Sequence, residues 1–491
     1  MGKRPIILLM AGAMGWSTPA LAEQPVAISW SAADLRFTKS SAEARAAEHQ
    51  AAAADLTAQS LATLRRPNID LSAQLVRYQK TLSVDVSSLK DQTQGNLDAY
   101  LGGLPGQFPA DLQGIVQQVT DRIEQALPGL LLPIPDTLKY QARETLFRPT
   151  ITAFMPLYTG GAIPALQKGA GAAAVAARAK ADADVNLARV NLARAYFGQT
   201  LAEGLERTAE SSLAAMDRHL FNADAFYRNG VLPKARVLEV QVARDAAARN
   251  LERARIDRQR ADDALQRILE MDAPVEAATP MFVHSKPLLP VADYVASATG
   301  GSPRVKEAEA TAKVAKAGVG LTRSRLLPQA YAFGEYSLDR KSAAPTEPDW
   351  IAGIGVRWTL LSSVDRRKAL AAAKERENAA RDGTEVAKKL VATEVSDAWA
   401  LAETARRSFL SLESSTAAAQ ENLRVAEIAF REGEGTAASV IDARAALTAV
   451  ETQRLAAAYE YDVALAALMA ASGRMQDYDA AVATADRRIG G

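Results

Sequence analysis

The chain contains four short stretches in which apolar and polar side chains alternate. They run from Asn68 to Gln74, from Arg148 to Met155, from Gln329 to Leu338, and from Ile351 to Trp358. A two-residue period predicts a β-strand, and it suits a strand with lipid on one side and water on the other. Any single stretch is better explained as an ordinary half-buried strand. Because there are four, arranged as two pairs, the pattern favours a sheet between lipid and water.

Long helices are predicted after each strand pair. Residues 165–229 contain no proline and consist mainly of helix formers, so a continuous helix would measure roughly 100 Å at 1.5 Å per residue. Proline is also absent from residue 349 to the end of the chain. A shorter helix is expected over residues 31–65, ending before Pro67. A coiled-coil stripe in the C-terminal part is formed by Leu447, Val450, Ala457, Tyr461, Leu465 and Leu468.

Each long helix is expected to end at a tight glycine turn. Gly230 and Gly433 would supply the backbone freedom of a helix C-cap. Pro233 and Thr436 suit the first residues of the returning helices. The chain should therefore turn at residues 230–233 and again at 433–436, giving two helical hairpins.

The segment around Gly433 repeats the segment around Gly230. When the two glycines are aligned, Tyr227 meets Phe430 and Glu239 meets Asp442. The chain therefore reads as two copies of one unit, each with a helix, two strands, a very long helix, a turn and a shorter helix. The predicted divisions are a first repeat at 23–272, a linking segment at 273–301, a second repeat at 302–473 and a C-terminal tail at 474–491.

The first repeat carries extra material between its two strands, at residues 81–146. Residues 111–127 have a helical pattern within it. The Gly and Pro content of the whole insertion predicts a folded loop without a large core of its own. We expect this inserted loop to lie on the extracellular side.

The first 22 residues have the pattern of a secretory signal peptide. Lys3 and Arg4 precede an apolar run, and a small-x-small site ends at Ala22. The protein is therefore expected to leave the cytoplasm. Removing the leader takes two of the 58 Lys and Arg residues, against 57 Asp and Glu. The resulting charge is near zero and gives no reason to expect nucleic acid as a partner.

The composition predicts neither catalysis nor a cofactor. Cysteine is absent, which excludes disulfides and thiolate metal sites. His49, His219 and His284 are scattered without metal-ligand spacing, and no nucleophile and base are recognisable. After the leader, no run of 18 apolar residues occurs, so a transmembrane helix is not expected. The chain is then either a soluble exported protein or a β-barrel membrane protein.

Four strands cannot cross a bilayer alone, because the two sheet edges would leave unpaired backbone groups in hydrocarbon. Closure requires several copies of the chain. The expected assembly is a small barrel, continuous with long helices that project from the membrane as a tube.

Over essentially the whole mature sequence, the chain resembles the TolC-type outer-membrane efflux protein family. No single motif is specific, but their order and double occurrence are. The residues that carry the resemblance are Phe226 to Glu239, Phe430 to Asp442, Tyr196, Trp399, Pro156 to Gly161, and Ser302 to Val305.

The resemblance implies a mainly α-helical protein with a β-barrel part. It implies a homotrimer with a twelve-stranded transmembrane β-barrel in outer-membrane lipid and a long periplasmic α-helical barrel. It also implies two partners, a periplasmic adaptor protein and an inner-membrane transporter of the RND, ABC or MFS type. Such channels export drugs, metals or proteins.

The resemblance also implies an acidic aperture at the periplasmic tip. Asp442 matches one acidic position of the family, Ser439 occupies the other, and Glu239 corresponds to Asp442 in the first repeat. Three copies of Asp442 facing the lumen would form a negative ring that favours cations. An equally good reading is a solvated charge near a helix N-terminus, where the helix dipole stabilises Asp.

Two further features of the tip follow from the resemblance. The family's inter-helix lock uses Tyr, Arg and Asp, but the matching positions are Phe430, Gly435 and Arg236, so this lock cannot form here. The surface expected to dock the adaptor surrounds the two turns and comprises Gly230, Val231, Leu232, Gly433, Gly435 and Phe430.

The alternative is a soluble periplasmic coiled-coil scaffold or adaptor protein, in which the alternating stretches would be strands of a small domain. A scaffold has no reason to keep Ile69, Leu71 and Leu75 facing outward, or to repeat the strand pair. The sequence therefore favours the channel.

Overall fold

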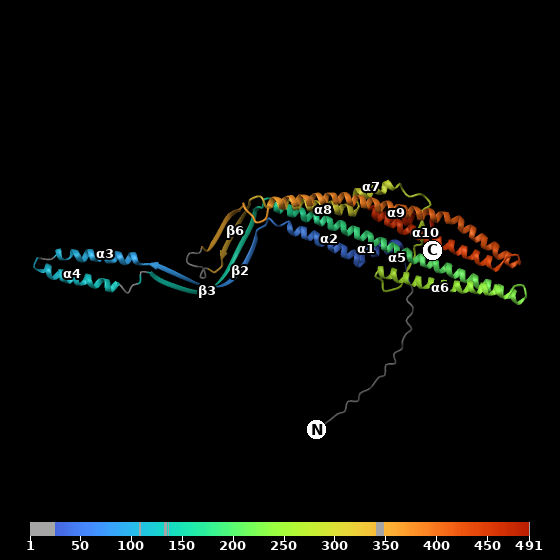
Figure 1. The fold of residues 1–491 in the computed structure, drawn as a ribbon, viewed down its shortest axis with the longest axis horizontal. Helices are drawn as coiled ribbons and strands as arrows, with labels where there is room; N and C mark the ends of the chain where they lie inside the picture. The colour runs from blue at the N-terminus through green and yellow to red at the C-terminus, as the bar shows by residue number, and fades with distance from the viewer. Residues whose placement is uncertain (1–24, 108–109, 132–134, 136, 340–347, 491) are drawn as a thin grey trace, which may run out of the picture. The chain divides into compact units, whose positions relative to one another are not determined.

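The computed structural model describes residues 25–107, 110–131, 135, 137–339 and 348–490. The predicted signal peptide lies outside the described residues. The chain forms two compact units, and Figure 1 shows their elements in chain order. The sheet unit contains residues 65–159 and 328–358. The helical unit contains the remaining described residues.

The sheet unit is built on four antiparallel strands in the order β2-β3-β6-β7. These are β2 (Asn68–Asp85), β3 (Thr137–Tyr158), β6 (Gln329–Ser337) and β7 (Trp350–Arg357). All four strands occur where the alternation predicted them. Strands β2 and β7 form the two edges, and neither edge has a partner strand among the described residues.

The strand register gives the sheet one apolar face and one mixed, more polar face. Ile69 pairs with Ala153, Ala332 with Met155 and with Ile354, so these side chains share a face. The opposite face carries polar residues, glycines and three aromatic rings. Its members include Asn68, Asp70, Ser72, Gln74, Thr150, Thr152, Phe154, Tyr331, Phe333, Glu335, Gly353, Gly355 and Arg357, and the apolar Ile351 opposite Glu335.

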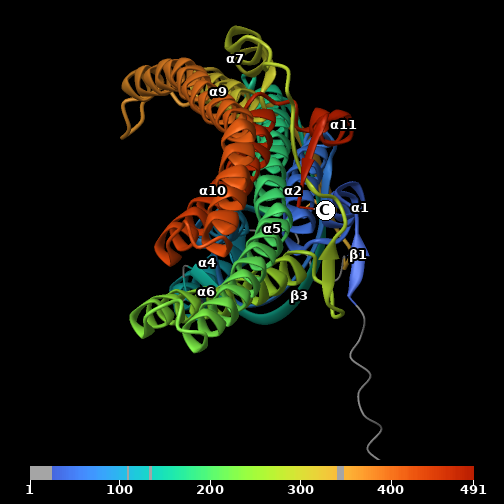
Figure 2. The ribbon, with the colours of Figure 1, turned by 90° about the vertical axis from the view of Figure 1, so that its right-hand side faces the viewer.

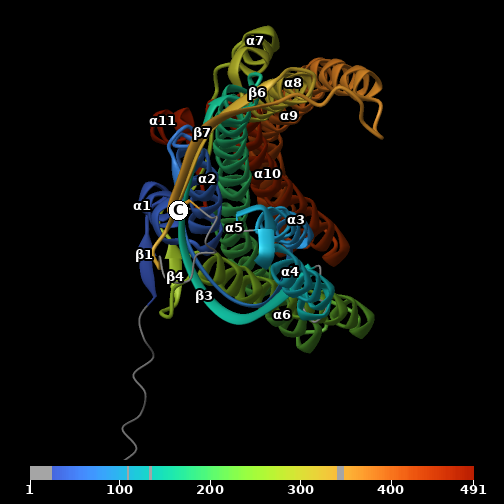
Figure 3. The same ribbon diagram turned by 90° about the vertical axis from the view of Figure 1, so that its left-hand side faces the viewer.

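The insertion differs from the predicted loop at 81–146. The β2–β3 ladder continues without interruption to the pair Asp85↔Thr137, so strands occupy both ends of this segment. Between them lie two helices, α3 (Ser87–Gly103) and α4 (Ala110–Leu131), side by side in Figure 3 and joined through the short 3-10 helix Pro105–Gln107. The helical pattern seen at 111–127 is thus confirmed, within a longer helix.

The helical unit contains a layer of four helices, α2 (Ala42–Leu61), α5 (Ala162–Arg228), α8 (Pro303–Ser324) and α9 (Arg366–Arg431). They pack in this order, α2 against α5, α5 against α8, and α8 against α9. The two very long helices are confirmed, with 67 residues in α5 and 66 in α9. Among the described residues, no helix has both the length and the apolar character needed to cross a membrane.

The helix expected over residues 31–65 is two helices. The first is α1 (Trp30–Ser40), and it ends at Ser41, whose backbone is extended. The Ser41 side chain accepts a hydrogen bond from the Ala44 N–H and caps α2. Because Ser is a strong N-cap residue, the break is a local capping event that the Ala-rich pattern concealed.

The glycine turns occur as predicted. Gly230 and Gly433 have φ of +74° and +79°, in the left-handed region that favours glycine. The returning helices are α6 (Lys234–Ile268) and α10 (Ala437–Ala471). Pro233 is the residue before α6, and Thr436 caps α10 through a reciprocal pair of hydrogen bonds with Ser439.

The largest core of the helical unit lies where the linking segment and the C-terminal tail meet the middle of α5 and α10. Strand β5 (Met281–Val283) pairs with β8 (Arg487–Ile489), and β1 (Val26–Ile28) with β4 (Val275–Ala277). Helices α7 (Val291–Gly301) and α11 (Tyr478–Thr484) complete this part. Figure 2 shows α1 and α11 on one side of α5. The largest fully buried side chains here are Trp30, Phe37, Tyr196, Phe197, Phe282, Phe409, Tyr461 and Tyr478.

Candidate functional site at the helix tips

The ends of the two helical hairpins share one apolar core, which we call the tip core. Its centre is Phe430, only 4% exposed. The Phe430 ring lies 4.6 Å from the His219 ring and 5.7 Å from the Phe226 ring, centroid to centroid. Since Phe430 belongs to α9 and the other two to α5, the core joins the hairpins. Its buried residues are Ala223, Val240, Leu423, Phe430, Ala437, Val440, Ala443 and Leu447.

The three positions of the family's lock have other roles here. Phe430 is buried in the tip core. A Cβ on Gly435 would lie 2.9 Å from the Phe430 backbone nitrogen, so only glycine allows this close turn. Arg236 donates to both carboxylate oxygens of Glu239 on its own helix, at 2.8 and 2.9 Å. The protomer's tip is therefore held by apolar packing.

The three aperture candidates differ in how their polar atoms are used. Glu239 is paired with Arg236. Ser439 accepts the Thr436 N–H at 3.2 Å and donates its own N–H to Thr436 Oγ1 at 3.1 Å, so it completes a capping box. Asp442 is exposed and forms no ion pair with any described residue. It lies three residues after Ser439, on the same face of α10.

The docking candidates also divide into exposed and packed positions. Gly230, Gly433 and Val231 are exposed, and Val231 is 62% accessible. Leu232 packs partly against the tip core. Phe430 is buried, so its side chain does not belong to the surface where it was expected.

An exposed apolar row on α6 was not predicted from the sequence. Leu238 and Val242 lie four residues apart on α6 and are more than half exposed, and the exposed Val231 lies in the turn that precedes the helix. Spacings of four and seven residues could have revealed this row, but the same spacing is typical of a buried face. Only the structure separates the two cases.

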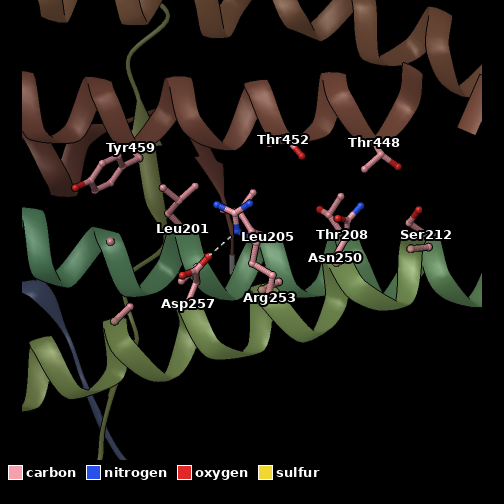
Figure 4. Close-up of a pocket in the computed structure, with 16 residues that line it drawn as sticks. Leu201, Leu205, Thr208, Ser212, Asn250, Arg253, Asp257, Thr448, Thr452 and Tyr459 are labelled. Carbon is pink, nitrogen blue, oxygen red and sulfur yellow. Dashed lines mark ion pairs between the residues drawn. The ribbon is translucent and has the colours of Figure 1, made fainter. Parts of the chain in front are cut away.

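A groove runs between α5, α6 and α10, farther along the hairpins than the turns (Figure 4). Its volume is about 500 Å³. Small residues such as Ala202 and Ala247 form part of its lining, and Thr and Ser side chains add hydroxyl groups. Arg253 and Asp257 of α6 form an ion pair of 3.8 Å within the lining. Three helices contribute to this groove, so no single sequence window could predict it.

Two titratable side chains at the tip are wholly or partly buried. Burial lowers the pKa of His219, whose Nε2 has no hydrogen-bond partner in the described chain. Burial likewise lowers the pKa of Arg444, which the carboxylates of Glu427 and Glu451 partly oppose. Burial therefore favours the neutral form of His219, whereas the carboxylates of Glu427 and Glu451 favour the charged form of Arg444.

In the part of the chain that the structure covers, no cluster of three or more His, Asp or Glu side chains could hold a metal ion.

The chain belongs to the outer membrane efflux protein family. The family model matches residues 137–270 and 295–474, which include the second strand pair, both long helices and both tips. Membership of this family places the protein in the outer membrane, with a large periplasmic portion. No curated protein matches the sequence significantly.

Solved structures share the fold at low sequence identity. A membrane protein from Pseudomonas aeruginosa is 16% identical, with a TM-score of 0.70, and the match covers 90% of this chain and 93% of that chain. CusC is 15% identical at a TM-score of 0.70, covering 96% and 98%. The open state of the MtrE outer membrane channel of Neisseria gonorrhoeae is 17% identical at 0.67, covering 91% and 89%. CusC and MtrE are both described as channels.

Proposed function

We propose that the protein is a homotrimeric exit channel in the outer membrane. It would pass substrates outward for a tripartite efflux or type I secretion system. The observation that carries the proposal is the two-faced sheet with open edges at β2 and β7. Three copies joined edge to edge would satisfy the edge backbone groups and close a barrel of twelve strands.

The exposed apolar face of the sheet supports a lipid-facing role. Ile69, Leu71 and Ile354 are each about 70% exposed in the single chain. A soluble scaffold or adaptor protein would lose stability and solubility by presenting this surface to water. In an outer-membrane barrel the same side chains contact lipid.

An internal duplication would explain the element order. The series helix, strand, strand, long helix, turn and helix occurs from α2 to α6 and again from α8 to α10. We infer two repeats, at 23–272 and 302–473, joined by the segment 273–301. Three chains would then supply six hairpins to the periplasmic tip.

The hairpins would bind a periplasmic adaptor protein. Helices of the adaptor can approach closely along the groove of Figure 4, because small side chains form part of its lining. The exposed Val231, Leu238 and Val242 offer apolar contacts nearer the turn. An inner-membrane transporter of the RND, ABC or MFS type would deliver drugs, metals or proteins to the open tip.

Asp442 is the aperture residue that best suits an acidic ring. Among the three candidates it is the carboxylate not held by Arg236 or used in a cap. Three copies facing the lumen would attract cations at the narrowest point. Asp442→Asn should therefore reduce cation selectivity.

Single-channel recording in a planar bilayer tests this function. Purified wild-type protein should form a cation-selective pore of low conductance, and Asp442→Asn should shift its reversal potential toward zero in a salt gradient. The control is Asp397→Asn, which removes an exposed carboxylate from α9 instead of α10. If Asp442→Asn leaves the selectivity of the pore unchanged, the channel proposal stands and the acidic ring is ruled out. A water-soluble protein without conductance would instead support the scaffold.

A further inference from the structure

A second groove lies between the first turns of α5 and the last turns of α8, with a volume of about 680 Å³. The helices approach closely here, because a Cβ on Gly169 would lie 3.2 Å from the Ala317 Cβ. The lining is made of small or apolar residues and three lysines, and it contains no carboxylate. Its residues are Gly161, Pro164, Ala165, Lys168, Gly171, Ala172, Val175, Lys313, Lys316, Ala317 and Gly320.

The three lysines of this groove have no partner in the described chain. Lys168, Lys313 and Lys316 are exposed, and none forms an ion pair or hydrogen bond with a described residue. By contrast, Lys180 and Arg178, farther along α5, are paired with carboxylates. Three cationic groups around an apolar floor complement an amphiphilic anion.

The groove is close to the strand ends along the chain. Strand β3 ends at Tyr158 and Lys168 follows in the second turn of α5, roughly 10 Å along the helix at 1.5 Å per residue. A similar length of helix separates Lys316 from the end of α8, and β6 starts soon afterwards at Gln329. If these strands cross the membrane, the lysines lie within reach of lipid headgroups at its periplasmic surface.

The groove lies in the middle of the helical layer, not at its edges. α5 packs between α2 and α8, and α8 packs between α5 and α9. A neighbouring copy would add at α2 or α9. The α5–α8 groove would therefore remain open to an occupant other than a second copy of the chain.

The face of α5 that carries the groove also carries α1. Lys168 and Val175 are followed at seven-residue spacing by Asp182 and Arg189, which places all four on one face of the helix. Arg189 binds the carboxylate of Asp34 in α1 through two hydrogen bonds of 2.7 and 2.6 Å. In the proposed trimer, elements added on the inner face would obstruct the lumen, so the face that carries α1 is the outer one and the groove opens away from the lumen.

We propose that this groove binds an anionic phospholipid from the periplasmic leaflet of the outer membrane. Its phosphate contacts Lys168, Lys313 and Lys316, and one acyl chain lies along Val175 and the neighbouring small residues. The orientation of the groove rests on the trimeric channel proposed above. A free phosphate would use the lysines but leave the apolar floor unoccupied.

Native mass spectrometry of the detergent-purified protein tests the proposal by counting bound lipid. Phosphatidylglycerol should bind in preference to phosphatidylcholine. The triple variant Lys168→Gln, Lys313→Gln, Lys316→Gln should weaken phosphatidylglycerol binding by about tenfold or more. The matched control changes the same charge at three exposed lysines outside the groove, Lys39→Gln, Lys234→Gln and Lys286→Gln, and should bind as wild type does.

A second variant tests the apolar part of the groove without changing charge. A Cβ on Gly171 would have no atom within 4 Å, so Gly171→Leu can be accommodated and should favour the helix. It should fill the groove and reduce phosphatidylglycerol binding. If Gly171→Leu binds normally while inorganic phosphate displaces the lipid, the site is a phosphate site and the lipid proposal is overturned.

The remaining outcomes distinguish a failure of the lipid-site proposal from a failure of the channel proposal. Equal binding of the two lipids, or undiminished binding to the triple lysine variant, would overturn the lipid site. Planar-bilayer conductance of the same preparations reports on the channel independently. If the wild-type protein conducts but shows no lipid preference, only the lipid-site proposal is overturned. If it does not conduct, the channel proposal is overturned.

Discussion

Single residues at the tips and in the main core carry properties that their sequence neighbours do not reveal. The glycine turns at 230 and 433 were predictable, because a positive φ is a local backbone requirement that glycine meets. The need for glycine at 435 was not, because it arises from contact with the backbone of Phe430. The pairing of Arg236 with Glu239 was not predicted, although the three-residue spacing on one helix indicates such a pair.

Asp462 is a buried carboxyl in the main core, and burial raises its pKa well above the ordinary range. It is fully buried, and the Phe282 N–H approaches its two oxygens at 3.4 and 3.3 Å. The folded state holds the proton more tightly than the unfolded state, so stability falls as pH rises above the unfolded pKa of about 3.9.

Asp462→Asn should therefore stabilise the protein at neutral pH, because it removes the ionisable group and keeps an oxygen that can accept the Phe282 N–H. We expect the melting temperature at pH 8 to rise by roughly 1 °C for each kcal/mol gained. Thermal unfolding followed by circular dichroism at pH 5 and pH 8 gives the measurement. Asp182→Asn, an exposed change, should have no effect. A lower melting temperature for Asp462→Asn would show that the charged form is stabilised.

His219 should make the tip core sensitive to acid. Burial against Phe430 lowers its pKa, and Glu427 is the carboxylate that acts in the opposite direction. Because the unfolded state binds the proton more readily, tip stability should fall as pH decreases below about 6.5. Hydrogen exchange of the peptide backbone near 423–447 should accelerate between pH 7 and pH 5, after correction for intrinsic rates.

His219→Phe should remove most of this pH dependence, and His49→Phe, on an exposed surface of α2, should leave it unchanged. Equal pH dependence in wild type and His219→Phe would exclude His219 as its source.

Among the elements, the tip hairpins show how two aligned segments acquire different environments. Tyr227 and Phe430 occupy the same place in the repeated segment, yet Tyr227 is 41% exposed and Phe430 is buried. Alignment predicts a common backbone, but which ring is buried depends on how the hairpins pack against each other.

Phe430→Ala should therefore loosen the tip. Removing a buried Phe ring costs about 3–5 kcal/mol. Limited proteolysis should cut near the turns of Phe430→Ala much faster than near those of the wild type, while Tyr227→Ala should change the rate little. Similar rates for the two variants would indicate that the tip core does not hold the hairpins together.

The strands show the limits of pattern reading in another way. The start of β2 was predicted correctly, but its continuation to Asp85 was missed. After Leu75 the apolar residues move from odd to even positions, so the alternation that began at Asn68 is interrupted. The hydrogen-bonded ladder continues past this point. Side-chain alternation reports the environment of a strand, whereas strand length depends on backbone pairing.

For the whole molecule, the sequence predicted a mainly helical chain with four strands, because long proline-free segments and alternating stretches are patterns along the chain. It did not predict the groove of Figure 4 or the lysine groove, because each depends on the register between separate helices. Nor did it predict the helical hairpin of α3 and α4 in the insertion.

The α3–α4 hairpin should be accessible from outside the cell if the insertion is extracellular. The chain contains no cysteine, so a single Cys can be labelled selectively. Asp98→Cys, exposed on α3, should react with a membrane-impermeant maleimide on intact cells. Asp442→Cys, which the proposed channel would place in the periplasm, should react only after the outer membrane is permeabilised. The reverse result would place the insertion in the periplasm.

Cross-linking between the two sheet edges tests the trimeric barrel most directly. The double variant Leu71→Cys, Ile354→Cys places one thiol on β2 and one on β7, both on the apolar face. Within one chain these edge strands are three strand spacings apart, roughly 14 Å. A bis-maleimide shorter than this should therefore link neighbouring chains, giving dimers and trimers and nothing larger. Each single variant should run as an uncross-linked monomer on a denaturing gel. An open ladder of higher bands, or no cross-link in protein that conducts, would contradict closure by three copies.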